Sequence, residues 1–213
     1  MKLKKIASLA LAGIMAVSML AGCKGATEPT EPENPVVPSA SGVASYLNDM
    51  LTSDQRKKIS FEDDSTLRAN TLAIATDSNV VTPTKITGAT TAASADPSVT
   101  KKVVDEYASG SFETTNWSTW VDATPAGNDG IDYYLATYVL DGDMTEVNVA
   151  DAIYTVWNNS FNNDLDNVNS KDTVWSGDVA AVKVYNSKNA DDTAWVVSVM
   201  ITKTITNGTN TQV

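Results

Sequence analysis

Residues 148–161, "NVADAIYTVWNNSF", form the clearest pattern in the sequence. Large apolar side chains recur here every three or four residues, which places them on one face of an amphipathic helix. The members of this face are Val149, Ile153, Val156, Trp157 and Phe161. Asn148 is the expected N-cap, because its side chain can accept a hydrogen bond from the first turn. The pattern predicts a helix that packs its apolar face on a sheet.

The partner sheet is expected downstream. Residues 177–185, "GDVAAVKVY", and 194–205, "AWVVSVMITKTI", are rich in β-branched side chains and are joined by the polar stretch "NSKNADD". In the second stretch one alternating face is apolar and the other is mixed. This pattern predicts an antiparallel hairpin at the end of a sheet. Residues 131–140, "IDYYLATYVL", predict a further strand that ends at Asp141–Gly142.

Helices are expected in the first half of the chain. Apolar spacing predicts one over residues 43–58, with Ser41 as its cap and Lys57–Lys58 at its C-terminus. A second helix follows a cap at Asp63 or Asp64, and it faces inward through Leu67, Thr71 and Ile74.

Residues 79–98 predict a long loop, and a third helix begins after Asp96 and Pro97. Helices precede strands along the chain, so the expected class is α+β with one domain over residues 43–206.

The N-terminal residues predict a location outside the cytoplasm. "MKLKK" is followed by an apolar stretch and then by "LAGC", which ends at Cys23, the only cysteine of the chain. The segment resembles a bacterial lipoprotein signal with its lipobox. The resemblance implies that residues 1–22 are cleaved off and that Cys23 carries the lipid. Residues 23–42 are rich in Pro, Glu, Ser and Thr and predict an extended tether. Residues 207–213 are expected to be a C-terminal tail.

The charge of the chain excludes one class of partner. The net charge is −11, and residues 1–22 hold three lysines and no acid, so residues 23–213 carry −11 − 3 = −14. An acidic surface of this kind repels phosphate backbones, so nucleic acid is not an expected partner. The expected partners are the membrane, through the lipid anchor, and an unidentified envelope protein or glycan.

The mature part resembles the CAP domain, the superfamily of cysteine-rich secretory, antigen 5 and pathogenesis-related-1 proteins. The resemblance rests on the element order and on a W-x-x-S-x-x-H helix, which Trp157 and Ser160 match. It implies an α-β-α sandwich with an antiparallel sheet. Asn163 stands where the motif has histidine, and the chain contains no histidine. An amide oxygen is a poor ligand for zinc-like metals, so no metal site of that family is expected here.

Without histidine, and with the one cysteine assigned to the lipid, carboxylates are the remaining catalytic candidates. Four acids lie around the expected strand and turn before the 148–161 helix, and a pair of them could serve a glycosidase. They are Asp132, Asp141, Asp143 and Glu146. The alternative is a solvated turn, since acids favour a helix N-terminus.

Two further sequence patterns are candidates for binding sites. Residues 162–172, "NNDLDNVNSKD", miss the Gly and Glu positions of an EF-hand, and leave at most a weak calcium site. Trp117, Trp120 and Trp175 are expected in polar loops and are candidates for a ligand groove, or for packing under those loops. Trp157 and Trp195 are expected in the core.

The sequence therefore predicts a membrane-anchored extracytoplasmic lipoprotein with a non-catalytic binding domain. The alternatives are a carboxylate-dependent hydrolase acting on glycans and a small solute-binding lipoprotein, which usually needs two lobes.

Overall fold

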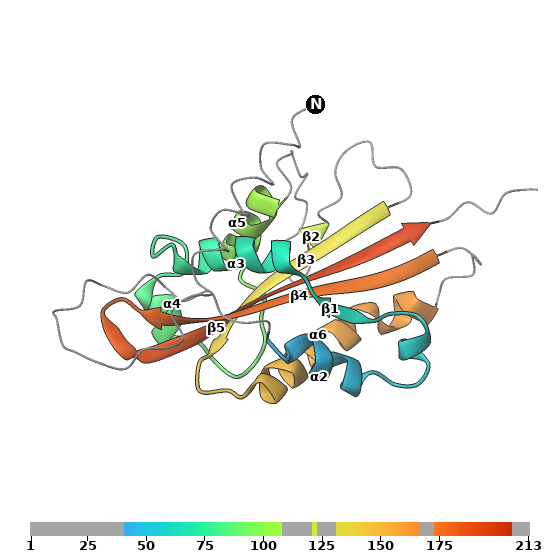
Figure 1. Cartoon of the computed structure of the whole chain (residues 1–213), viewed down its shortest axis with the longest axis horizontal. Helices are drawn as coiled ribbons and strands as arrows, with labels where there is room; N and C mark the ends of the chain where they lie inside the picture. The colour runs from blue at the N-terminus through green and yellow to red at the C-terminus, as the bar shows by residue number, and fades with distance from the viewer. Residues whose placement is uncertain (1–40, 108–120, 123–130, 167–172, 206–213) are drawn as a thin grey trace, which may run out of the picture. The chain divides into compact units, whose positions relative to one another are not determined.

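A computed structural model describes residues 41–107, 121–122, 131–166 and 173–205 (Figure 1). Strands and helices are labelled as in that figure. The strands are β1 Phe61–Asp63, β2 Val121–Asp122, β3 Ile131–Asp141, β4 Thr173–Asn186 and β5 Asn189–Ile205. The helices are α2 Val43–Met50, α3 Ser65–Thr76, α4 Pro83–Thr87, α5 Pro97–Tyr107 and α6 Glu146–Asp166, with a 3₁₀ turn η1 at Gln55–Lys57. The expected signal segment, Cys23, the tether and the C-terminal tail lie outside the described residues.

The strands form one sheet in the order β1-β4-β5-β3-β2. The β4–β5 and β3–β5 pairs are antiparallel, but β1 runs parallel to β4. The sheet is therefore mixed, whereas an antiparallel sheet was expected. The predicted hairpin is present, yet its position at the end of the sheet is wrong. β5 lies between β4 and β3, and the face that had looked mixed is buried too, including Val196, Ser198 and Met200.

Helices cover both faces of this sheet, and the expected α+β class is confirmed. α2 and α6 pack on one face, and α3, α4 and α5 on the other, as Figure 1 shows. In the first core, Val149, Ile153 and Trp157 of α6 are fully buried, and the Trp157 ring meets Phe61 edge-on at 5.4 Å between centroids. Val156 is partly buried against the same core, and the side chain of Phe161 lies outside the described residues.

The second core explains the mixed pattern of β5. Leu67, Thr71 and Ile74 of α3 are buried, as predicted. The Thr71 hydroxyl donates to Ser198 Oγ at 2.9 Å, and Ser198 Oγ lies 3.0 Å from Thr137 Oγ1. A hydroxyl in an apolar interface is stabilised when it finds such partners. Ser198, the buried polar residue of β5, is therefore satisfied inside the molecule.

The helix starts show which capping predictions hold. Asp64 caps α3 by accepting from Leu67 N at 2.5 Å, and α5 follows Asp96, both as predicted. Asn148 is not the cap of α6: the helix begins at Glu146, and Thr145 Oγ1 accepts from Asn148 N at 3.3 Å. The earlier hydroxyl takes this role because the Thr145 carbonyl already accepts the first helical bond, from Val149 N at 2.9 Å.

The first helix is shorter than predicted. α2 ends at Met50 because Leu51 is extended, and the basic residues near position 57 belong to η1 instead. Ser41 does not cap α2: Gly42 holds that position, and Ser41 Oγ has no hydrogen-bond partner in the described chain. Within the described residues, none of the helices combines the length and the apolar character that crossing a membrane requires.

The predicted loop at 79–98 contains a short helix. Thr82 Oγ1 accepts from Lys85 N at 3.3 Å, and Pro83 occupies the first turn of α4, where its missing N–H costs nothing. The Thr-Pro pair is a helix-start signal that the loop prediction missed. The remainder of this stretch crosses the edge of β3 and builds the site described next.

Candidate ligand grooves

Residues 90–95 form an arch along the outer edge of β3, and we use that name for them below. At one end, Asp141 N donates to Thr90 O at 3.1 Å. At the other, Ala95 bridges to Tyr138, and Asp96 N donates to Thr137 O at 2.8 Å. Both ends therefore pair with the strand edge. The residues between them, 91–94, are exposed or half-exposed.

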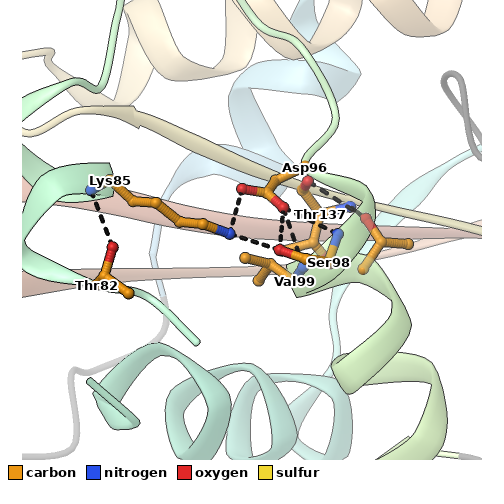
Figure 2. A network of polar contacts seen from close by, with 7 residues as sticks. Thr82, Lys85, Asp96, Ser98, Val99 and Thr137 are labelled. Atoms are coloured by element: carbon orange, nitrogen blue, oxygen red, sulfur yellow. Dashed lines mark hydrogen bonds and ion pairs between the residues drawn. The ribbon is translucent and has the colours of Figure 1, made fainter. Parts of the chain in front are cut away.

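A polar network fixes the C-terminal end of the arch (Figure 2). Asp96 Oδ1 accepts from the backbone N–H groups of Ser98 at 3.0 Å and Val99 at 3.1 Å, which caps α5. Its Oδ2 lies 2.6 Å from Lys85 Nζ, and Lys85 also donates to Ser98 Oγ at 2.6 Å. Figure 2 shows Lys85 reaching from α4 toward Asp96. The network thus joins α4, the arch and α5.

The same contacts determine the ionisation of Asp96. Burial alone would raise the pKa of this carboxyl, but hydrogen bonds from Lys85, Ser98 and Val99 outweigh it and hold the pKa below its ordinary value. Asp96 is therefore ionised at neutral pH and its charge is compensated by Lys85. A compensated pair of this kind positions the arch and leaves no net charge for a ligand.

A groove lies on each side of the arch. The first, of about 340 Å³, runs between the arch and α4, and Lys85, Gly88, Ser94 and Asp96 are among its lining residues. The second, of about 480 Å³, runs between the arch and α6. Its lining comprises Thr91, Ala92, Ala93, Met144, Asn148, Asp151, Ala152, Thr155 and Val156. Ala92 lines both grooves, and the small side chains of the arch leave this space open.

The tryptophans proposed for a groove are not brought together by the described structure. Trp175 lies in β4 and not in a loop, and it is buried in the core beside α6, so that prediction is wrong. The strand extends to Thr173 because Trp175 pairs with Lys203 of β5, whose ammonium lies 5.8 Å from the indole ring. Trp117 and Trp120 lie outside the described residues.

Trp157 and Ser160, the two residues that match the W-x-x-S motif, both make contacts within the fold. Trp157 is fully buried, and its Nε1 has no hydrogen-bond partner in the described part of the chain. Ser160 Oγ donates to Val156 O at 2.9 Å, within the helix. The side chain of Asn163 and residues 167–172 of the proposed calcium loop lie outside the description. In the described ranges, no group of three or more His, Cys, Asp or Glu side chains could hold a metal.

The predicted group of four carboxylates is not brought together as a whole, because Asp132 is separated from the acids of the turn after β3. Asp132 and Asp141 lie near opposite ends of β3, and the length of the strand separates them by roughly 30 Å. Asp141 Oδ1 accepts from Asp143 N at 2.8 Å, which shapes the turn after the strand. Glu146 Oε2 accepts from Gly42 N at 3.0 Å, which joins the start of α2 to α6.

Another acidic group was missed. Asp178 of β4 pairs in register with Glu62 of β1. The next pair in the register is Asp63 with Val179, and Asp64 follows directly in the chain. Burial, followed by the charges of Asp64 and Glu62, raises the pKa of Asp178 to about 6. Arg68 does not offset these charges, because it pairs with Asp63. The sequence signal was an acid within the mostly apolar stretch at 177–185. Asp178 lines neither groove.

No protein family, no curated protein and no solved structure matches this chain.

Proposed function

We propose that this chain is a lipid-anchored extracytoplasmic protein whose folded domain binds a ligand in the grooves beside the arch, without chemistry of its own. The observation that carries the binding role is the arch itself. Its two ends are tied to β3 and α5, while its middle leaves open space on both sides. Ligand sites are commonly concave and largely preformed, with a few polar groups on an apolar wall.

The anchor is supported by the sequence of residues 1–42. A basic start, an apolar stretch, the "LAGC" box and a polar tether occur in the order that a lipid-modified surface protein needs. The test is to express the full chain and the Cys23→Ser variant in a bacterium supplied with labelled palmitate. We expect label and membrane association for the native chain, and neither lipid label nor a mature anchored form for the variant. Equal labelling of the two chains would overturn the anchor.

The groove is tested by filling it. Ala92 lines both grooves and is exposed, so Ala92→Phe places a large ring in the open space with little effect on the core. A fragment library is screened by amide NMR shifts on the native chain, and hits are repeated on the variant. We expect hits to move the signals of residues 84–97 or 144–156, and to lose affinity in Ala92→Phe.

The matched control is Ala69→Phe, which changes another exposed alanine, on α3, that lines neither groove. It should leave binding unchanged. Hits that map away from the arch, or that bind equally well to Ala92→Phe, would contradict the proposal.

The two alternatives have less support. A glycosidase needs two carboxyl groups about 5–10 Å apart across a cleft, whereas each groove has one acid in its lining, and Asp96 is paired with Lys85. A solute-binding lipoprotein of a transporter usually closes two lobes on its ligand. The described helices and strands instead pack on a single sheet.

We also propose kinship with the CAP superfamily. Helical layers on both faces of the sheet, and a Trp157 that packs its helix into the core, support the proposal. The residues present do not fit the metal of that family, since the chain has no histidine. An experimental structure that superposes on CAP domains over α6, β4 and β5 would support the kinship, and a different connection of these elements would contradict it.

A further inference from the structure

The groove between the arch and α6 combines an apolar wall with a single charge. Ala93, Met144 and Val156 are partly buried against the first core and expose the remainder of their surface. Asp151, exposed on α6, is the one charged residue of the lining. In the described part of the chain its carboxylate forms no ion pair, whereas Asp96 of the other groove is paired with Lys85.

Two neutral oxygen acceptors accompany this carboxylate. The Thr155 hydroxyl donates its proton to Asp151 O at 3.0 Å, so its lone pairs remain to accept from a ligand. Asn148 lines the same groove and offers an amide oxygen. One carboxylate and two neutral oxygens match the three N–H donors of a primary ammonium in number and in charge.

We infer that the groove beside α6 takes a lysine side chain of a peptide partner, an inference that rests on the binding function proposed above. The ammonium lies at Asp151 and the methylenes of the side chain lie against Met144, Ala152 and Val156. Lysine side chains place their stem on apolar surface and their charge in a polar setting in this way. A charge-assisted hydrogen bond to the carboxylate supplies the specificity.

The charge of the whole chain favours the same ligand. Residues 23–213 carry a net charge of −14, from −11 less the three lysines of residues 1–22. A field of that sign raises the local concentration of cationic ligands and speeds their association at low salt. Basic peptides are therefore drawn to the surface and held where the carboxylate of Asp151 meets an apolar wall.

The test compares two peptides that differ only in the charge. Acetyl-Ala-Lys-Ala-amide and acetyl-Ala-norleucine-Ala-amide are titrated into the purified full chain, and amide NMR shifts of residues 91–93 and 144–156 are followed. We expect the lysine peptide to shift these signals and to bind about tenfold more tightly than the norleucine peptide. Asp151→Asn should abolish that difference. The control Asp49→Asn, which changes an exposed aspartate on α2, should retain it.

The outcomes separate this inference from the proposed function. If both peptides bind equally at the groove and Asp151→Asn changes nothing, the groove binds ligands but the lysine inference is overturned. If neither peptide shifts these signals while other fragments do, the inference also fails and the binding function stands. If the lysine peptide shifts signals elsewhere, and Asp151→Asn leaves those shifts intact, the assigned site is wrong.

Discussion

Replacing Asp178 by Asn should stabilise the protein at neutral pH and remove part of its pH dependence. Asp178 lies on β4 beside Glu62 and Asp64, and burial with these two charges raises its pKa from 3.8 to about 6. A folded state with the higher pKa binds the proton more tightly than the unfolded chain. The associated stability is therefore complete below about pH 4 and is lost as the pH rises through about 6.

The size of the effect follows from that difference. A change of pKa from 3.8 to about 6 corresponds to at most about 3 kcal/mol. Asp178 is only half-buried, and solvent screens its neighbours, so we expect roughly 1–2 kcal/mol. The neutral amide of Asn is similar in shape and has no charge to repel. Asp178→Asn should therefore raise the melting temperature at pH 7 by roughly 3–6 °C for a domain of this size.

The assay is urea unfolding of both proteins at several values between pH 4 and pH 7.5, followed by tryptophan fluorescence. The stability gain of the variant should grow as the pH rises from 4 to about 6 and then stay constant. Asp49→Asn, on the exposed surface of α2, is the matched control and should show no such trend. A gain that is the same at pH 4 and pH 7, or a variant less stable at pH 7, would refute the reasoning.

Three further perturbations test the packing and the arch. Trp157→Ala empties a fully buried site between α6 and Phe61 and should lower the free energy of unfolding by about 3–5 kcal/mol, measured in urea. In Gly177→Ala the new Cβ would collide with the Phe61 ring, so a loss of about 1–3 kcal/mol is expected, and adding Phe61→Leu should recover part of it in a double-mutant cycle. Asp96→Ala removes the α5 cap and the Lys85 partner and should lower the free energy of unfolding by about 1–2 kcal/mol at pH 7. Because the pKa of Asp96 in the folded state is lowered, the native protein should lose this contribution as the pH falls below about 4. Calorimetry at pH 3 and pH 7 measures the stability difference between the native protein and Asp96→Ala, and the same difference at both pH values would contradict the argument.

Local signals allowed several helices and strands to be predicted from the sequence. Asp64 and Asp96 each precede an amphipathic stretch, and each caps its helix through a backbone N–H three residues on. The apolar stripe that contains Trp157 faces the sheet as its spacing requires. In these cases the residues that decide the structure lie within one or two turns of one another.

Long-range contacts explain several of the failures. Trp175 follows a polar stretch typical of a loop, but pairing with β5 extends β4 through it. The loop prediction holds for the arch itself, but nothing in its own residues indicates that Thr90 and Asp96 bond to an edge of β3, which lies far along the chain. The acids at positions 132 and 141 seemed close only because the length of the strand between them was not considered. These cases depend on positions that are distant from one another in the sequence or in space.

The central place of β5 has a consequence for how the chain acquires its structure. β5 is the last described strand to be synthesised, yet it pairs with both β4 and β3 along nearly their whole lengths. Until residues 189–205 have left the ribosome, the two halves of the sheet have no common neighbour, and both helical layers lack their support. The nascent polypeptide therefore has no finished core in this sheet until β5 is available, and the apolar faces of β3 and β4 stay exposed until then.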